Sequence, residues 1–264
     1  MEKHAVFPEG PLLESGLNDG VLILTLNRPR RFNALSHASI SALHVALDAA
    51  AGNQSARVVV IAANGEAFCA GHDLKEMNAA NDQAFVAEMF RLCSAMMLKI
   101  AALPVPVIAE VNGMATAAGC QLVAQCDLAV AADHARFAVS GVNLGLFCST
   151  PAVPLSRTIS RKRAAEMLMT GEFIDATTAL DWGLVNRVVP AAALRAETMK
   201  LAESMKAKPR ATLAAGKALL YRQMELGLTA AYQDASSAIA GDFMHPEARE
   251  GIAAFLEKRK PDWP

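Results

Sequence analysis

The sequence FCAGHDL, residues 68–74, follows an apolar run at 57–63 and precedes a segment with helical character. A second stretch of small residues, NGMATAAGCQ at 112–121, follows the apolar run 105–111 in the same way. Small residues at a strand-to-helix turn let a ligand approach the backbone, and the free N–H groups of a helix start point toward it. If the two turns face each other, they predict a site where two backbone donors hold one developing oxyanion.

Outward from these turns, strand and helix patterns alternate first, and helices dominate after Arg161. The expected strands are 21–27, 57–63, 107–111, 128–132 and 136–139. The expected helices are 36–51 with Ser36 as N-cap, 82–103, 118–125, 162–170, 176–182, 191–206, 210–227, 229–240 and 246–258. This order predicts an α/β body with a helical C-terminal region, divided into residues 1–200 and 201–264. Strand–strand–helix turns would stack as a short spiral, although the sequence shows no clear repeat.

Composition limits the classes of function. The chain has 264 residues, of which 53% are hydrophobic, so it can build a sizeable core. Its formal net charge of −1 gives no excess of positive charge that would attract nucleic acid. Its five cysteines show neither a CxxC pair nor the spacing of a metal site, which favours a reducing compartment. Residues 1–10 lack an apolar signal region, and no stretch approaches membrane-spanning length. We therefore expect a cytoplasmic protein with no metal, nucleic-acid or membrane partner.

Further motifs occur along nearly the whole chain in one order. They are NRP (27–29) with NAL (33–35), the two turn sequences, CDL (126–128), TGE (170–172), GLV (183–185) and FLEKRKP (255–261). Together they resemble the enoyl-CoA hydratase/isomerase (crotonase) superfamily. The run LGLFCSTP at 144–151 resembles the branch of that family typified by the enoyl-CoA hydratase domain-containing protein 3 group, a resemblance that implies no particular activity.

The resemblance implies a crotonase-like ββα spiral with a helical C-terminal trimerisation region, assembled as a homotrimer or a dimer of trimers. It implies an acyl-CoA thioester as ligand, with coenzyme A as part of the substrate rather than a permanently bound cofactor. The thioester oxygen would be held by the backbone N–H groups of His72 and Ala118. The second position is usually glycine in the family, and the methyl group of Ala118 is tolerable if φ is negative there.

The resemblance also points to residues that contact the substrate or coenzyme A. They are Arg30, Phe32, Ala70, Asp73, Leu74, Lys75, Ser140, Phe255 and Lys258. Of the basic residues in these segments, Arg30, Arg31 and Lys75 would contact the phosphates or the adenine of coenzyme A. Each of them alone would be interpreted as an ordinary surface charge. Asp73 is better suited to cap the following helix than to take part in chemistry. Phe255 and Lys258 match a pair that covers the adenine in relatives, sometimes from a neighbouring subunit; the alternative is an amphipathic helix with Phe255 buried.

Two side chains have open alternatives. For His72, the favoured role is that of its backbone N–H alone, and the alternative is an imidazole acting as general acid or base. For Cys148, the favoured role is that of a small buried hydrophobic residue, and the alternative is a nucleophile that attacks the thioester.

The sequence lacks the two acid–base residues of a hydratase. The family hydrates 2-enoyl thioesters with two glutamates around one water, and the corresponding positions here are Gln121 and Gly141. An amide cannot accept the proton of the water and glycine has no side chain, so hydration should be slower by several orders of magnitude. No carboxylate occurs in 138–151 to replace them.

These residues predict an acyl-CoA enzyme that stabilises an enolate or a tetrahedral oxyanion, formally in the class of enoyl-CoA hydratases, which are lyases. Isomerisation, thioester hydrolysis or decarboxylation needs fewer side chains than hydration. The alternative from another class is a non-catalytic acyl-CoA-binding or assembly protein that keeps the pocket.

Overall fold

The computed structural model describes residues 10–263 and contains a six-stranded sheet. In spatial order its strands are β1 (Leu13–Asn18), β2 (Val21–Leu26), β3 (Val58–Ala63), β5 (Val107–Val111), β7 (Leu128–Ala132) and β10 (Arg187–Val189). Neighbouring strands are parallel except for the β1–β2 hairpin. Parallel neighbours need crossover connections, and these carry the helices.

A smaller sheet collects the short strands that follow the large ones. Its order is β4 (Ala67–Cys69), β6 (Met114–Thr116), β8 (Arg136–Ala138) and β9 (Ile174–Asp175). Because β3 leads to β4, β5 to β6 and β7 to β8, the chain winds through successive strand–strand–helix turns. This arrangement confirms the predicted α/β class and the ββα spiral.

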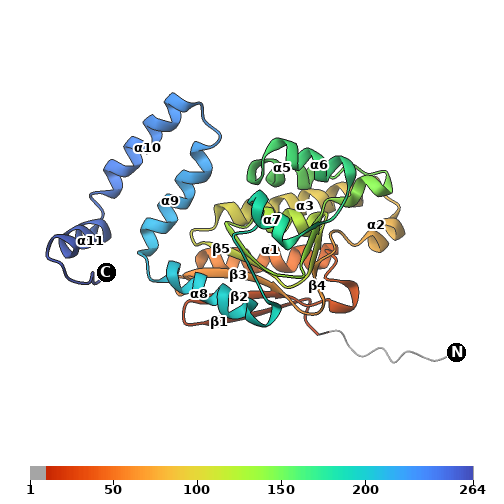
Figure 1. Ribbon diagram of the computed structural model, residues 1–264, viewed down its shortest axis with the longest axis horizontal. Coiled ribbons are helices and arrows are strands. Elements are labelled where there is room, and N and C mark those ends of the chain that lie inside the picture. The colour runs from red at the N-terminus through yellow and green to blue at the C-terminus, as the bar shows by residue number, and fades with distance from the viewer. Residues whose placement is uncertain (1–9, 264) are drawn as a thin grey trace.

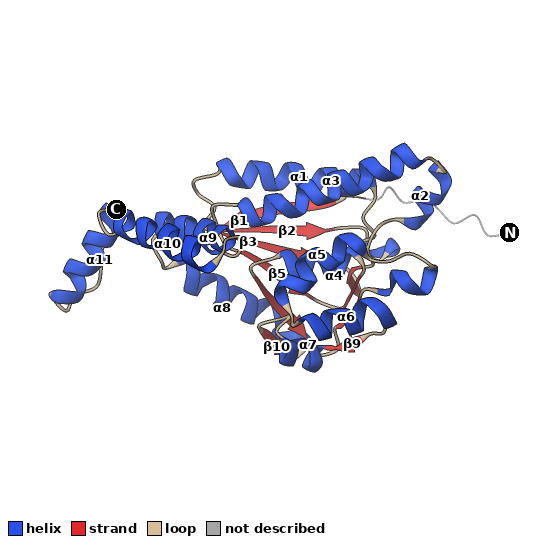
Figure 2. Ribbon diagram, turned by 90° about the horizontal axis from the view of Figure 1, so that it is seen from above, coloured by secondary structure: helices blue, strands red, loops and turns tan. Residues whose placement is uncertain are grey.

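Helices cover the body on several sides. They are α1 (His37–Gly52), α2 (Leu74–Ala80), α3 (Gln83–Ala102), α4 (Ala118–Gln125), α5 (Ser149–Thr158), α6 (Arg161–Thr170), α7 (Ala176–Trp182) and α8 (Leu194–Lys206). Three short 3₁₀ segments join them: η1 (Pro29–Arg31), η2 (Ser140–Leu144) and η3 (Ala191–Ala193). Figure 2 shows α1 and α3 on one side of the large sheet and α8 on the other.

Both faces of the large sheet are buried, which explains its uninterrupted apolar strands. In β3, Val59 and Ile61 belong to the core on the α1 and α3 side, whereas Val58 and Val60 belong to a second core closed by α8. Successive residues of a strand point to opposite faces, so a strand covered on both sides is apolar throughout.

Helix starts follow the capping signals of the sequence. Ser36 accepts a hydrogen bond from the N–H of Ser39 and confirms the predicted N-cap of α1. Asp82 caps α3, so the predicted helix 82–103 is found one residue shorter at each end. The sequence did not predict α5, because Pro151 and Pro154 lie within its ten residues. Pro151 occupies the first turn, where no intrahelical N–H bond is lost.

The C-terminal helices leave the body as an arm. It consists of α9 (Arg210–Gln223), α10 (Leu228–Asp242) and α11 (Pro246–Leu256), and it extends away from α2 in both views (Figures 1 and 2). The division at 200/201 expected from the sequence falls inside α8, whereas the arm starts at α9.

One buried lysine fastens the arm to the body. Lys217 of α9 donates from Nζ to the carbonyl oxygens of Ile100 and Val105 at 2.8 and 3.1 Å, and to Asp127 Oδ2 at 2.6 Å. Tyr221 donates its hydroxyl to Asp127 Oδ1 at 2.8 Å. Burial lowers the pKa of Lys217, and the neighbouring carboxylate of Asp127 opposes that shift.

Replacing Lys217 with methionine should lower the free energy of unfolding by roughly 3 kcal/mol, because it leaves the Asp127 carboxylate without its positive partner and removes the donor that binds the carbonyls of Ile100 and Val105. Urea unfolding of the full chain measures the change. Lys200→Met, at an exposed position of α8, is the matched control and should change stability by less than about 0.5 kcal/mol. Equal stability of the two variants would contradict this role of Lys217.

Candidate active site

The two glycine-bearing turns touch each other through their backbones. A Cβ atom on Gly119 would lie 2.1 Å from the carbonyl oxygen of Cys69. A Cβ on Gly71, whose φ is +88°, would lie 2.9 Å from Cβ of Ala117. Neither position has room for a side chain, so the turn after β4 and the turn after β6 pack at a distance that only glycine allows.

The first turn leaves one amide free between two bonded neighbours. The N–H of Leu35 donates to the Gly71 carbonyl at 2.7 Å, and the N–H of Asp73 donates to the Leu35 carbonyl at 3.0 Å. These bonds hold the backbone on both sides of His72. The N–H of His72 itself donates to no acceptor within residues 10–263.

The second turn presents the start of α4. The N–H of Ala117 donates to the Ala138 carbonyl at 2.9 Å, whereas the N–H of Ala118 has no acceptor in the described chain. Ala117 has φ 50° and ψ −118°, a conformation that favours glycine and costs about 1–3 kcal/mol for other residues. Ala118 is not among the residues with positive φ, as its methyl group requires. The strain at this turn therefore lies one residue before the expected donor.

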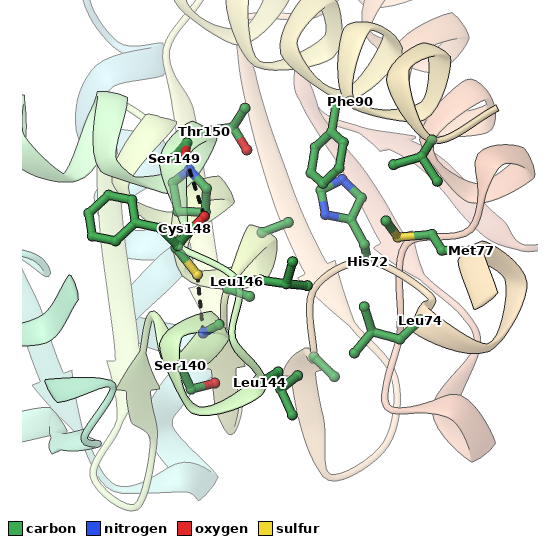
Figure 3. A pocket seen from close by; sticks show the side chains of 17 residues that line it. His72, Leu74, Met77, Phe90, Ser140, Leu144, Leu146, Cys148, Ser149 and Thr150 are labelled. Carbon is green, nitrogen blue, oxygen red and sulfur yellow. Dashed lines mark hydrogen bonds between the residues drawn. The ribbon is translucent and has the colours of Figure 1, made fainter. Parts of the chain in front are cut away.

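A cavity of about 470 Å³ opens beside both turns. His72, Leu74, Met77 and Phe90 form one wall, and the segment from Ser140 to Thr150 forms the opposite wall (Figure 3). The full lining consists of Ala70, His72, Leu74, Met77, Val86, Phe90, Ala117, Ala118, Ser140, Gly141, Leu144, Leu146, Phe147, Cys148, Ser149, Thr150 and Pro151. None of these residues is Asp, Glu, Lys or Arg.

The imidazole of His72 is packed rather than hydrogen-bonded. It meets the ring of Phe90 edge-on with 4.7 Å between centroids, and its Nε2 atom is buried without a partner in the part of the chain described (Figure 3). Burial lowers the pKa of His72 to about 4. The ring is therefore neutral at pH 7 and is a weak base.

The position expected for the second glutamate is physically filled. The N–H of Gly141 donates to Cys148 Sγ at 3.3 Å, and its carbonyl accepts from the N–H of Leu146 at 3.0 Å. A Cβ on Gly141 would lie 2.5 Å from the Leu146 carbonyl oxygen and 2.7 Å from Cys148 Sγ. The loop 144–148 folds back onto Gly141 and occupies the space of a side chain.

The position of the first glutamate is buried beside the cavity. Gln121 is only 3% exposed and does not line the cavity, and its Oε1 atom has no hydrogen-bond partner within the described residues. Ser140 does line the cavity, and its hydroxyl shares a 3.0 Å hydrogen bond with that of Thr116. The described cavity lining thus carries the hydroxyl of Ser140 but no carboxylate, and the amide of Gln121 lies outside that lining.

The cysteines near the cavity are protonated thiols. Burial raises the pKa of Cys148, and the N–H of Gly141 opposes that effect. Burial raises the pKa of Cys120 to about 12. These shifts favour the structural role of Cys148 over that of a nucleophile, because the thiolate is the attacking form.

The structure gathers only part of the site predicted from the sequence. Ala70, His72, Leu74, Ala118, Ser140 and Gly141 line the cavity. Asp73 does not: it caps α2 by accepting the N–H of Glu76, as expected, and pairs with Arg28 at 3.0 Å.

The remaining predicted contacts lie outside the cavity of the same chain. Phe32 accepts the N–H of Ala70 with its carbonyl at 3.0 Å, while its side chain is 53% exposed beside the exposed Arg30. Lys75 is exposed at the start of α2. Phe255 and Lys258 lie on and just after α11, at the far end of the arm, and Phe255 is 82% exposed rather than buried.

Sequence reasoning missed most of the apolar lining. On α2 and α3, Leu74 and Met77 are three residues apart, and Val86 and Phe90 are four apart, so each pair shares a helix face. That periodicity was visible in the sequence. Which helix face turns toward the cavity depends on the packing of α3 against α1, α4 and α9 and of α2 against α3.

Neither a metal centre nor a membrane segment was found in the described range. Within residues 10–263, no three His, Cys, Asp or Glu side chains are grouped so that they would hold a metal ion. Over the same range, each helix is too short or too polar to span a bilayer.

Comparison with known proteins shows the same family over almost the full length. The family model described as enoyl-CoA hydratase/isomerase matches residues 16–264. Mitochondrial enoyl-CoA hydratase domain-containing protein 3 of Mus musculus is 47% identical over 97% of this chain and 85% of its own length. The 2,3-dehydroadipyl-CoA hydratase of Escherichia coli is 36% identical over 92% of this chain and 94% of its own length.

Solved structures agree with these relatives. An enoyl-CoA hydratase from Mycobacterium smegmatis has a TM-score of 0.94 and 56% identity, covering 96% of this chain and 99% of that one. Human enoyl-CoA hydratase domain-containing protein 3 has a TM-score of 0.93 and 45% identity, covering 96% of this chain and 100% of that one.

The relatives contradict the cytoplasmic location expected from the sequence. Five curated proteins named mitochondrial are 44–47% identical to this chain over most of its length. The expectation rested on the missing apolar signal region and on cysteines that favour a reducing compartment, which does not by itself identify the cytoplasm. The missing signal region concerns secretion and carries no information about amphipathic organelle-targeting sequences.

The fold, the paired turns and the near-full-length matches all lead to one assignment. The resemblance to the domain-containing protein 3 branch is confirmed by relatives of that name. The chain belongs to the enoyl-CoA hydratase/isomerase family, whose members act on acyl-CoA thioesters.

Proposed function

We propose that this protein binds an acyl-CoA thioester with the thioester oxygen between the backbone N–H groups of His72 and Ala118, and that hydration is not its main reaction. Within the described residues 10–263, the observation that carries the proposal is the pairing of two free amides with a cavity that has no carboxylate in its lining. The protein would polarise the thioester and stabilise an enolate or tetrahedral oxyanion.

The free backbone amides support the proposal that the protein binds the thioester oxygen. Each well-placed backbone donor in an oxyanion hole is worth roughly 3–4 kcal/mol of transition-state stabilisation. Gly71 and Gly119 bring the two turns into contact, and hydrogen bonds hold the residues around His72. The donors are fixed before the ligand arrives, so no reorganisation opposes the charge that develops on the oxygen.

The lining argues against efficient hydration. Adding water to a 2-enoyl thioester requires a base for the water and an acid for the α-carbon. Gln121 is an amide, Gly141 has no room for a side chain, and His72 has its pKa lowered to about 4. Thioester hydrolysis, isomerisation or decarboxylation of a substrate that carries its own carboxylate needs fewer protein groups.

A second candidate is a non-catalytic acyl-CoA-binding protein. It is favoured by the same contrast: the donors are retained, while the packed Gly141 and the neutral His72 leave the cavity without a strong base. A screen of acyl-CoA substrates for hydrolysis, isomerisation and decarboxylation separates the two candidates. Turnover of any substrate supports the enzyme, and binding without turnover supports the non-catalytic protein.

The proposal assigns no permanently bound cofactor, since coenzyme A enters with the substrate. Its phosphates would lie outside the uncharged cavity, near the exposed Arg30, Arg31 and Lys75. Phe255 and Lys258 would reach this region only from a neighbouring copy. The 82% exposed Phe255, with other exposed apolar side chains of the arm, supports assembly as a homotrimer or a dimer of trimers.

Hydration of crotonyl-CoA should be at least ~10⁴-fold slower in kcat/KM than in a family hydratase with both glutamates, because each missing acid–base group costs about 10²–10⁴-fold. The absorbance of the enoyl thioester measures this rate.

Isotope-edited infrared spectra of a bound acyl-CoA analogue should show the carbonyl stretch at lower frequency than in water. Ordinary hydratase turnover would contradict the loss of acid–base groups, and an unshifted carbonyl would contradict the oxyanion site.

Restoring the two glutamates should not restore hydration. Gly141→Glu places Cβ against the Leu146 carbonyl and Cys148 Sγ, so it should lower the free energy of unfolding by about 2 kcal/mol or more and displace the loop. The double variant with Gln121→Glu should therefore stay slow with crotonyl-CoA. Gly216→Glu is the matched control, because a Cβ there meets nothing within 4 Å. A stable double variant with fast hydration would show that the loop makes room.

His72 should make stability fall in mild acid. Its folded pKa, about 4, lies below the unfolded value of about 6.5, so above pH 6.5 the neutral ring carries no penalty. Between pH 6.5 and 4 the unfolded chain binds the proton first, and stability drops by up to about 3 kcal/mol. Urea unfolding should show a smaller drop for His72→Gln, and an unchanged drop for His134→Gln at an exposed position. Identical pH profiles of wild type and His72→Gln would exclude a buried neutral ring.

A further inference from the structure

We propose that the acyl-binding part of this site is specific for hydrocarbon chains longer than four carbons and rejects chains whose far end, away from the thioester, is a carboxylate. The inference rests on the proposed function, because it assumes that the thioester lies between His72 and Ala118. It goes further by naming the chemical class of the acyl group and the path that the group takes through the protein.

The interior of the cavity fits an apolar chain. Its two walls contribute Leu74, Met77 and Phe90 on one side and Leu144 and Leu146 on the other (Figure 3). None of the lining residues in 10–263 is charged, so the phosphates of coenzyme A must stay outside. The acyl group is the part of the ligand that gains by leaving water, and each buried methylene should strengthen binding about fourfold.

A second hollow continues the cavity toward the surface. It has a volume of about 500 Å³ and shares Leu74, Met77, Val86, Leu144 and Leu146 with the cavity. These five side chains border both hollows, so the hollows adjoin between α2–α3 and the segment 140–146, and we infer that the acyl chain passes from one to the other along this passage. A four-carbon acyl group would fill only the part beside the donors, whereas a longer chain reaches the shared residues.

The outer end of the passage disfavours an anionic chain terminus. It is lined by Asn78, Asn81, Asp82 and Gln83, which include a carboxylate and no cation. Asp82 is held as the N-cap of α3 by the N–H groups of Ala84 and Phe85. A terminal carboxylate would lose its water inside an apolar passage or meet the like charge of Asp82, and both arrangements are unfavourable.

One relative marks the contrast. The Escherichia coli protein that is 36% identical is named for 2,3-dehydroadipyl-CoA, whose acyl chain ends in a carboxylate. The passage here contains no arginine or lysine among its described lining residues to pair with such a group. The inference therefore separates this chain from that relative by substrate class.

Calorimetry with the full chain tests the inference. The ligands are 2-oxoalkyl thioether analogues of acyl-CoA, which keep the carbonyl and cannot be hydrolysed. The analogue of hexanoyl-CoA should bind on the order of a hundredfold more tightly than that of adipyl-CoA, which differs by its terminal carboxylate. From the butanoyl to the decanoyl analogue, affinity should rise about fourfold per methylene until the chain reaches the outer end.

A pair of variants locates the chain in the passage. Val86→Phe narrows the shared segment, so it should weaken the decanoyl analogue at least tenfold and the shorter butanoyl analogue by a clearly smaller factor. Val45→Phe adds the same bulk at an exposed position of α1 and should change neither affinity. Circular dichroism and urea unfolding confirm that both variants are folded.

The outcomes separate the two proposals. The inference is overturned if affinity does not depend on chain length, or if the adipyl and hexanoyl analogues bind equally well. The proposed function still stands in that case, provided that the butanoyl analogue binds with a shifted carbonyl stretch. If no analogue binds more tightly than free coenzyme A, the proposed function itself fails. An equal loss of butanoyl and decanoyl affinity in Val86→Phe would also contradict the passage.

Discussion

The contact between two backbone turns is the constraint on which the site depends. Gly119 lies against the carbonyl of Cys69, and Gly71 lies against Ala117, at separations that exclude any side chain. The parallel strands β3 and β5 deliver the two turns to neighbouring places, and the short strands β4 and β6 pair directly before them. Because the turns are held by strand pairing and by each other, the amides of His72 and Ala118 are fixed by the fold. The cost of this arrangement is visible as the unfavourable backbone conformation of Ala117.

The opposite wall determines which chemistry the donors can support. The loop 144–148 returns onto Gly141 and bonds to both its N–H and its carbonyl, so the wall is closed by packing where proton transfer would require a carboxylate. The same loop turns Leu144 and Leu146 toward the cavity. The same loop therefore fills the space beside Gly141 and adds apolar surface to the cavity, and these two features support the proposal that the protein polarises a hydrocarbon thioester rather than adding water to it.

The arm is fastened close to the donor-bearing turn. Asp127, which accepts from Lys217 and Tyr221 of α9, comes shortly after the end of α4 and also accepts the N–H of Val107 at the start of β5. The element that presents Ala118 and the element that carries the arm therefore share one buried polar cluster. Such a cluster is costly to break, because each remaining group would stay buried without its partner. The position of α9 relative to the site is fixed by this cluster, whereas α10 and α11 extend beyond it.

Much of the fold was readable from the sequence. Buried parallel strands are apolar throughout and helix starts carry Ser or Asp caps, so 57–63, 107–111 and the start of α1 were predicted from local patterns. The strands β1, β4, β6, β9 and β10 and the helix α5 were not predicted. All of these strands except β1 have only two or three residues and give a weak pattern, and prolines argue against a helix at α5. Packing of neighbouring segments, and not local preference, forms them.

For the site, the sequence by itself determined which groups are present: small residues at two turns, an amide at 121, and no side chain at 141. Tertiary structure alone decided that the turns touch, that the half-buried His72 ring packs against Phe90 and is neutral, and that the loop fills the space beside Gly141. It also decided that Val86 and Phe90 face the cavity, while Phe255 and Lys258 lie at the far end of the arm and away from the cavity. The physical reason is that residue chemistry is a local property, whereas burial, steric exclusion and proximity depend on segments that are distant in sequence.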